Sequence, residues 1–132
     1  RPALGGNIIA KIECKTKPQM ATVRTTSDFA DIIVSGGKGV ANKIDKLEKI
    51  ALKYNAELGA SRGLVDMGKI PYSAQIGLTG KTVCPKIYIA IGISGAVHHT
   101  VAIENADAII AINPDKDARI FEYADFGIID EF

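Results

Sequence analysis

Ser94 and Gly95 stand between two apolar runs, in a pattern that could bind phosphate. The run Ile87–Ile91 is uncharged and rich in β-branched residues, which is typical of a strand buried on both faces. After Gly92, we expect Ser94 to cap a helix whose first turns are Ala96–Ala102. We expect Gly95 to let a ligand approach the backbone closely. A second strand, Ala108–Ile112, completes a βαβ unit. Its turn presents free N–H groups and a positive helix end, which predicts a nucleotide or dinucleotide site.

A second glycine turn follows another apolar run. Ile32–Ser35 predicts a buried strand, and Gly36–Gly39, with Lys38 inside it, separates this strand from a helix. The glycine spacing matches neither the dinucleotide fingerprint nor a phosphate-binding P-loop, in which lysine precedes serine or threonine. The turn alone is therefore weak support for a ligand site, because a plain strand-to-helix turn explains it about as well.

The titratable residues do not assemble a metal site or a nucleophilic triad in the sequence. His98 and His99 are neighbours on a predicted helix, so their side chains point about 100° apart and do not grip one ion together. Cys14 and Cys84 supply at most half of a structural zinc site, and free thiols are the expected state of both. No nucleophile, base and orienting acid occur together, so the pattern does not indicate substrate turnover.

One helix positions the middle of the chain. We expect Asn42 to cap it and Gly59 to end it. Its lysines predict a solvated face, with a partner-binding basic patch as the alternative. Ser61 and Arg62 then fall at a strand end before a short helical segment, Leu64–Met67, where open α/β sheets bind ligands. A core-facing stripe is formed by Ile44, Leu47, Ile50, Ala51 and Tyr54.

Composition is that of an ordinary globular domain. The 132 residues are 47% hydrophobic and 23% charged, with a net charge of +1, which gives no support to nucleic-acid binding. No apolar run is long enough for a membrane span, and no signal peptide is recognisable, so we expect no membrane insertion and a cytoplasmic protein. Because the chain starts at Arg1 without methionine, a fragment or a processed subunit is the expectation.

The glycine turn and its flanks also carry a family resemblance. The pattern comprises Tyr88-Ile89-Ala90, Gly92-Ile93-Ser94-Gly95, Val97, His99 and Ala111-Ile112-Asn113, and it resembles the signature of the electron transfer flavoprotein alpha subunit, whose members bind FAD. Two positions depart from that signature. His98 stands where relatives usually have glutamine, and Ala102 where they usually have glycine.

The N-terminal part resembles the family's passage out of a preceding domain. Asn7–Glu13 and Met20–Val23 are extended candidates that would pair as a hairpin or join a sheet edge. In relatives a longer segment follows this passage, so this chain is either shortened or lacks a loop between Arg24 and Thr25. We therefore expect residues 1–29 to end a preceding domain and residues 30–132 to form the FAD-binding domain.

The resemblance also implies which residues contact the flavin. Arg62, in the segment GASRGLVDMG, would lie beside the isoalloxazine ring. Elsewhere in the chain, the Thr79 hydroxyl would bind N5, and His99 would donate to O2. Leu78 stands where relatives usually have glutamine, and Lys38 stands where they usually have arginine. Near the adenosine end, Asp130 and Glu131 compete for one acidic position. The full set implied is Lys38, Ser61, Arg62, Gln75, Ile76, Gly77, Leu78, Thr79, Gly80, Ser94, Gly95, Ala96, Val97, His98, His99, Asn113, Asp130 and Glu131.

Together these patterns predict an α/β fold: an open, three-layer, mostly parallel sheet with helices on both faces, Rossmann-like and preceded by a short extended segment. The resemblance implies an FAD-binding electron carrier that is not itself an enzyme. It would pair with an electron transfer flavoprotein beta subunit and take electrons from dehydrogenases or NADH, in the cytoplasm or, in a eukaryote, the mitochondrial matrix. The alternatives are an NAD- or adenine-nucleotide-binding module without redox work, and a fragment that binds nothing.

Overall fold

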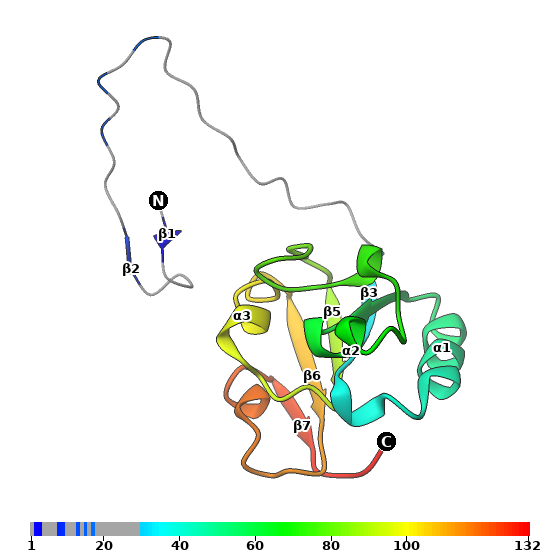
Figure 1. Cartoon of the computed structure of the whole chain (residues 1–132). Coiled ribbons are helices and arrows are strands. Elements are labelled where there is room, and N and C mark those ends of the chain that lie inside the picture. Colours follow the sequence, from blue (N-terminus) through cyan, green and yellow to red (C-terminus); the bar gives the residue numbers. More distant parts are fainter. Residues whose placement is uncertain (1, 4–7, 10–12, 14, 16, 18–29) are drawn as a thin grey trace.

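A five-stranded parallel sheet forms the centre of the molecule. The computed structural model describes residues 2–3, 8–9, 13, 15, 17 and 30–132. The sheet order is β4-β3-β5-β6-β7, and every neighbouring pair is parallel (Figure 1). The predicted α/β class is therefore confirmed. The strands are β3 (Ile32–Gly36), β4 (Glu57–Ala60), β5 (Ile87–Ile91), β6 (Ala108–Ile112) and β7 (Phe126–Ile128).

Two apolar clusters cover the two faces of the sheet. On one face, helices α1 (Ile44–Lys53) and α2 (Arg62–Asp66) bury Leu47 and Leu64 against Ile91 and its neighbours. The other face carries α3 (Val97–Thr100) and the short 3₁₀ helix η3 (Arg119–Glu122), and its cluster includes Ile103, Ile120, Tyr88 and Ala90. Successive residues of β5 thus pack in opposite layers, as a central strand requires.

The strand order creates a crevice between β3 and β5. From β3 the chain winds through α1 to β4 on one side, and then crosses to β5 on the other side of β3. The connection that leaves the carboxyl end of β3 therefore runs toward β4, and the connection that leaves the carboxyl end of β5 runs the opposite way, toward β6. In open α/β sheets ligands bind at such a switch point.

The sequence predicted a strand end at Ser61 but no bounds for strand β4, whose position corrects two local predictions. Helix α1 ends at Lys53, and Asn55 adopts a left-handed φ of 49°, so the chain turns before Gly59, which lies inside β4. Gly59 therefore does not end the helix. Asn42 does not cap it either, because Lys43 occupies the N-cap position without a side-chain hydrogen bond.

The remaining elements match the expectations in part. Strand β1 (Pro2–Ala3) pairs antiparallel with β2 (Ile8–Ile9), while the candidate strand Met20–Val23 lies outside the described residues. The last strand of the sheet, β7, runs from Phe126 to Ile128. Between α2 and β5, residues 67–86 contain only a 3₁₀ turn, η2 (Tyr72–Ala74), and isolated bridges.

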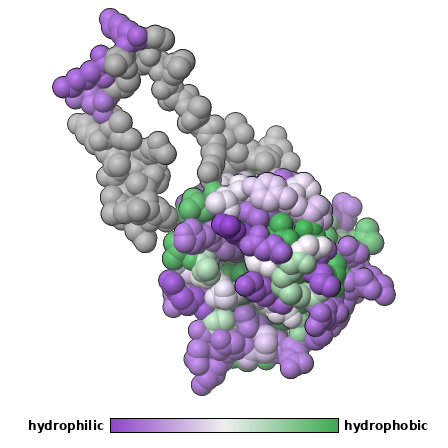
Figure 2. All heavy atoms as spheres, in the orientation of Figure 1, coloured by the Kyte–Doolittle hydropathy of each residue, from purple (hydrophilic) through white to green (hydrophobic). Residues whose placement is uncertain are grey.

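The surface is mainly hydrophilic on the face shown in Figure 2, with small groups of hydrophobic residues between the charged ones. The four α1-region lysines are exposed, as a solvated face requires. Cys84 is an exposed free thiol, and Cys14 lies outside the described residues. In the described part of the chain, no helix has the length and apolar character needed to cross a membrane. The exposed lysines are Lys43, Lys46, Lys49 and Lys53.

Candidate functional site

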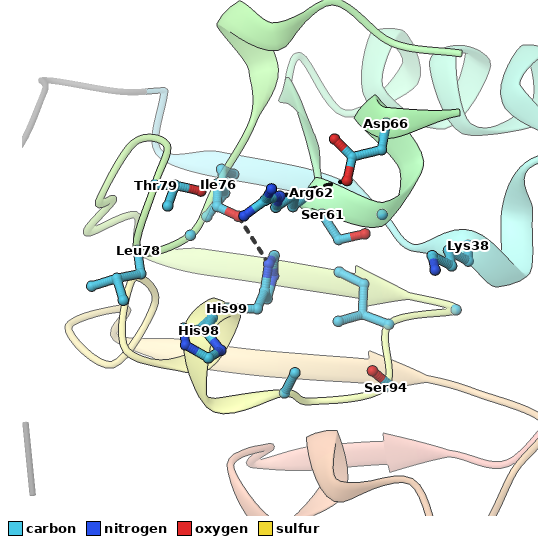
Figure 3. Close-up of a pocket in the computed structure, with 15 residues that line it drawn as sticks. Lys38, Ser61, Arg62, Asp66, Ile76, Leu78, Thr79, Ser94, His98 and His99 are labelled. Carbon is cyan, nitrogen blue, oxygen red and sulfur yellow. Dashed lines mark hydrogen bonds and ion pairs between the residues drawn. The ribbon is translucent and has the colours of Figure 1, made fainter. Parts of the chain in front are cut away.

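The main cavity lies at the carboxyl ends of β3, β4 and β5. Its volume is about 460 Å³, within the range of about 300–1,000 Å³ that is typical of ligand pockets. Figure 3 shows Lys38 and Ser94 toward one end and Thr79 and Leu78 toward the other, with Arg62 and His99 between them. Four separate chain segments therefore meet at the switch point of the sheet. This is the convergence that the sequence predicts for one crevice.

Lys38 is placed by a close crossing of two glycine loops. The Gly37 amide donates to the Ile91 carbonyl at 2.8 Å. A Cβ atom at Gly37 would lie 2.0 Å from the Gly92 carbonyl oxygen, so only glycine fits there. The Lys38 stem crosses α2 over Gly63, where an added Cβ would lie 2.4 Å from its Cε. The lysine is thereby directed along the cavity wall.

Ser61 and Arg62 follow directly from the end of β4. The Ser61 amide donates to the Gly36 carbonyl at 2.9 Å, which ties the start of α2 to the end of β3. The Arg62 guanidinium lies 3.5 Å from the Asp66 carboxylate, one helical turn later, and both side chains are more than 60% exposed. An exposed pair of this kind contributes at most about 1 kcal/mol. This ion pair therefore restrains the Arg62 side chain only weakly, and the guanidinium can reorient toward an anionic ligand.

Thr79 lies at the rim of the cavity on a loop fixed by several hydrogen bonds. The Tyr72 hydroxyl donates to the Thr79 carbonyl at 2.6 Å. The Gln75 amide donates to the Thr79 hydroxyl at 3.0 Å. Because the Thr79 oxygen already accepts this bond, its own proton remains available to donate toward the cavity. The arrangement suits a side chain that must offer a hydrogen bond to a ligand.

His99 is buried in the wall between the two ends of the cavity. One ring nitrogen lies 2.9 Å from the Tyr88 hydroxyl, and the other lies 3.0 Å from the Ile76 carbonyl oxygen. Burial lowers the pKa of His99 from 6.5 to about 4. Burial also raises the pKa of the Tyr88 phenol well above its ordinary value. Both groups are therefore uncharged near neutral pH.

The turn after β5 differs from the prediction in its helix cap. Ser94 is not the helix cap, because α3 begins later and Ala96 occupies its N-cap position. Gly95 has a φ of 85°, and an added Cβ would lie 2.1 Å from the Ile120 amide nitrogen. The close neighbour that requires a glycine here is the protein's own backbone. Ser94 and Ala96 do line the cavity.

Most of the expected site residues come together in this cavity. Those that line it are Lys38, Ser61, Arg62, Ile76, Gly77, Leu78, Thr79, Ser94, Ala96, His98 and His99. Those outside its wall are Gln75, Gly80, Gly95, Val97, Asn113, Asp130 and Glu131.

Several of the residues outside the wall make structural contacts, among them Asn113 and Asp130. The Asn113 amide donates to the Ile93 carbonyl at 2.9 Å, and its oxygen accepts from the Asp115 amide at 3.0 Å. The Asp130 carboxylate accepts from the Glu131 amide at 2.7 Å. Asn113 therefore fixes the turn after β6 with both ends of its side chain.

Four cavity residues were not among the expected set, namely Gly63, Asp66, Gly92 and Ile93. The spacing of Asp66 four residues after Arg62 on a helix is a signal that could have indicated it. Gly92 and Ile93 belong to the quoted glycine turn. Gly63 gives no signal, because its importance comes from a contact with distant Lys38. Within the described residues, no cluster of three His, Cys, Asp or Glu side chains is arranged to hold a metal ion.

The cavity chemistry suits a phosphate-bearing organic ligand. Lys38 and Arg62 outnumber the single carboxylate of Asp66, so the local field favours an anion. Ser61, Thr79 and Ser94 add hydroxyl groups, and Ile76, Leu78 and Ile93 supply apolar wall. Lys38 at one end, an apolar, hydroxyl-bearing region at the other and Arg62 between them fit a dinucleotide with a flat aromatic ring.

Comparison with known proteins agrees with this chemistry. Residues 28–104 match the family model of the electron transfer flavoprotein FAD-binding domain. The chain is 38% identical over 175 aligned positions to an electron transfer flavoprotein subunit alpha of Thermoanaerobacterium thermosaccharolyticum, covering 98% of this chain and 53% of that protein. It is 47% identical to a protein of the same name from Mycobacterium leprae, covering 85% and 36%. It is 50% identical to Protein FixB of Azotobacter vinelandii, covering 76% and 29%.

These relatives are longer than the chain, which spans about half or less of their length. The alignment with the Thermoanaerobacterium protein is longer than the 132-residue chain itself, so that relative has residues within the aligned region that this chain lacks. This agrees with the expectation of a longer segment in relatives.

Proposed function

The chain belongs to the family of electron transfer flavoprotein alpha subunits, and from this premise we propose that residues 30–132 bind FAD and use it to carry electrons. The observation that best supports the proposal is the meeting of Lys38, Arg62, Thr79 and Ser94 on one cavity at the switch point of the sheet. FAD would supply the redox chemistry, and the protein its binding, orientation and electrostatic environment.

The two ends of the cavity suit the two parts of such a ligand. Lys38, Ser61 and Ser94 would hold the diphosphate by charge and hydroxyl hydrogen bonds. Arg62, Leu78 and Thr79 would border the isoalloxazine ring. Because Asn113, Asp130 and Glu131 lie outside the cavity wall, we propose that the adenosine end extends beyond it toward the ends of β6 and β7. A beta subunit, and dehydrogenases or NADH as electron donors, are further parts of this proposal.

Titration with FAD tests the proposal directly. Purified chain should quench flavin fluorescence on binding, turn yellow, and release FAD on denaturation. Lys38→Met should weaken FAD binding about tenfold or more, because a charged hydrogen bond to phosphate is lost. Lys46→Met is the matched control, since Lys46 is also exposed but lies on α1 over Phe132. Protein that ignores FAD but binds AMP or NAD would replace the proposal with a nucleotide-binding module.

Replacement of Arg62 by alanine should lower the reduction potential of bound FAD while much of the binding is retained. The guanidinium favours a reduced, negatively charged flavin, and its loss removes about 1 to 4 kcal/mol at ~4 Å, or roughly 40 to 170 mV for one electron. The lower figure is expected, because Arg62 is 68% exposed. Potentiometry measures the effect. Arg119→Ala, which removes an exposed arginine paired with Glu122 outside the cavity, should leave the potential unchanged.

Replacement of Thr79 by alanine should change the visible spectrum of bound FAD more than its affinity. The hydroxyl accepts from Gln75 and has one proton left for the ligand, so its loss alters one contact at the ring edge. Absorbance and fluorescence titrations separate the two effects. Ser73→Ala provides the comparison, because Ser73 is exposed on η2 and lies outside the cavity. An unchanged spectrum would remove Thr79 from the ring edge.

A further inference from the structure

Helix α2 contains a glycine where its own stability would favour another residue. Gly63 is the second residue of this five-residue helix. Glycine loses more conformational freedom than alanine when a helix forms, so alanine would favour the helix. The φ of Gly63 is not positive, so the backbone conformation does not require glycine either. The reason for a glycine therefore lies in the space that the missing side chain leaves free.

The stem of Lys38 occupies that space. An added Cβ at Gly63 would lie 2.4 Å from the Lys38 Cε, 3.0 Å from its Cγ and 3.1 Å from its Cδ, and these are the nearest atoms outside the helix itself. Three consecutive methylene groups of the lysine therefore lie against the first turn of α2. Lys38 is an exposed residue, and exposed lysines commonly pack the stem on the protein while the ammonium stays in water.

Both the backbone and the stem of Lys38 are thereby placed before any ligand binds. Its backbone follows Gly37, which lies against the Gly92 carbonyl, and its stem lies against Gly63. Lys38 and Gly63 both line the cavity. None of the salt bridges among the described residues includes Lys38, so its charge remains available to an anionic ligand. A side chain that is already placed loses less freedom on binding, and the affinity is higher for that reason.

We propose that Gly63 is a positioning residue for phosphate recognition: the absence of a side chain lets the Lys38 stem cross α2 and brings its ammonium to the diphosphate of the ligand. Gly63 acts through Lys38 and not through a contact of its own. The inference rests on the proposed function for the identity of the ligand. It adds that FAD and ADP, which share a diphosphate, depend on Gly63 to a similar extent.

Gly63→Ala tests the inference, because affinity should fall without a loss of stability. The new methyl group overlaps with the end of a flexible side chain, which can rotate away, and alanine favours the helix. The midpoint of urea unfolding should therefore stay the same or rise. FAD affinity from flavin fluorescence and ADP affinity from calorimetry should both fall about fivefold. A lower unfolding midpoint would show that the methyl group disturbs the fold, and would overturn the inference.

A double-mutant cycle shows whether Gly63 acts through Lys38. Lys38→Ala removes both the stem and the charge, so Gly63→Ala in that background should cause no further loss of FAD or ADP affinity. An equal loss in both backgrounds would mean that the methyl group meets the ligand directly, and the positioning role would be wrong. Gly68→Ala is the control, because nothing lies within 4 Å of its added Cβ and Gly68 is outside the cavity wall. Its ligand affinities should equal those of the wild type.

Two further measurements report on the lysine itself. The ligand-free protein should show a nuclear Overhauser effect between the Lys38 ε-methylene and the Gly63 α-protons, and its absence would contradict the placement of the stem. ADP affinity should depend less on salt concentration in Gly63→Ala than in the wild type, because salt screens a cation that lies beside the diphosphate. An equal salt dependence in the two proteins would show that the ammonium is not placed by Gly63.

Failure of this inference and failure of the proposed function give different results. If ADP binds and FAD does not, the proposed function fails, whereas the ADP measurements still decide the role of Gly63. If FAD binds equally well to the wild type and to Gly63→Ala, the proposed function stands and the positioning role fails. If neither ligand binds, both fail.

Discussion

Replacement of Gly37 by alanine should destabilise the domain by at least about 3 kcal/mol. The new methyl carbon would lie 2.0 Å from the Gly92 carbonyl oxygen and 2.7 Å from the Ile93 Cα, and all of its close neighbours are backbone. Side-chain rotation cannot relieve this overlap, so the carboxyl ends of β3 and β5 must separate. Because the cavity lies at these ends, ligand affinity should fall together with stability. Urea unfolding followed by circular dichroism gives the free energy.

Gly68→Ala separates this effect from the general cost of replacing a glycine. Nothing lies within 4 Å of an added Cβ at Gly68, although its φ is 67°. The left-handed conformation alone should cost about 1 kcal/mol. If Gly37→Ala lowers the free energy of unfolding no more than Gly68→Ala does, the close contact between Gly37 and Gly92 is not required for stability.

Acidification from pH 7 to pH 4 should remove up to about 3 kcal/mol of folding free energy through His99 alone. Burial lowers the pKa of this ring from 6.5 to about 4 in the folded state, so the unfolded chain binds the proton more tightly. The stabilisation is complete above the unfolded pKa and is lost as the pH falls through 6.5 toward 4. Denaturant titrations at several pH values measure the slope.

Two variants assign this slope to the buried ring. His99→Asn should remove the His99 contribution, so the difference between wild type and variant should shrink as the pH falls. His98→Asn, at the exposed neighbouring position, should follow the wild type. If both variants gave the same pH dependence as the wild type, His99 would not be the group that titrates.

The bounds of the central strands could be predicted from the sequence, whereas for β4 only the strand end before Ser61 could be predicted. Ile87–Ile91 and Ala108–Ile112 are short, uncharged apolar runs, and such runs indicate strands buried on both faces. Strand β4, Glu57–Ala60, has no β-branched residue and begins with two good helix formers. It is also an edge strand. Its local sequence therefore continues the helical pattern, and the turn at Asn55 decides the outcome.

The site was predictable where it depends on position after a strand. Lys38 and Arg62 follow the ends of β3 and β4, so topology alone brings them to the switch point. Contacts between distant segments gave no local signal. Gly95 is needed because Ile120 lies against it, and the His99 ring is engaged by Tyr88 and Ile76. A single sequence does not reveal such partners.

The long connection between α2 and β5 has a consequence for the lifetime of the protein. Residues 67–86 lack an α-helix, yet the stretch 76–79 forms part of the cavity wall. A ligand that bridges this wall to Lys38 and Arg62 would bind only the closed arrangement of the loops, and mass action would then deplete open forms in proportion to ligand concentration. Proteases such as trypsin, which cleave after lysines including Lys69 and Lys86, attack the open forms. Cofactor supply would thus set the rate at which the chain is degraded.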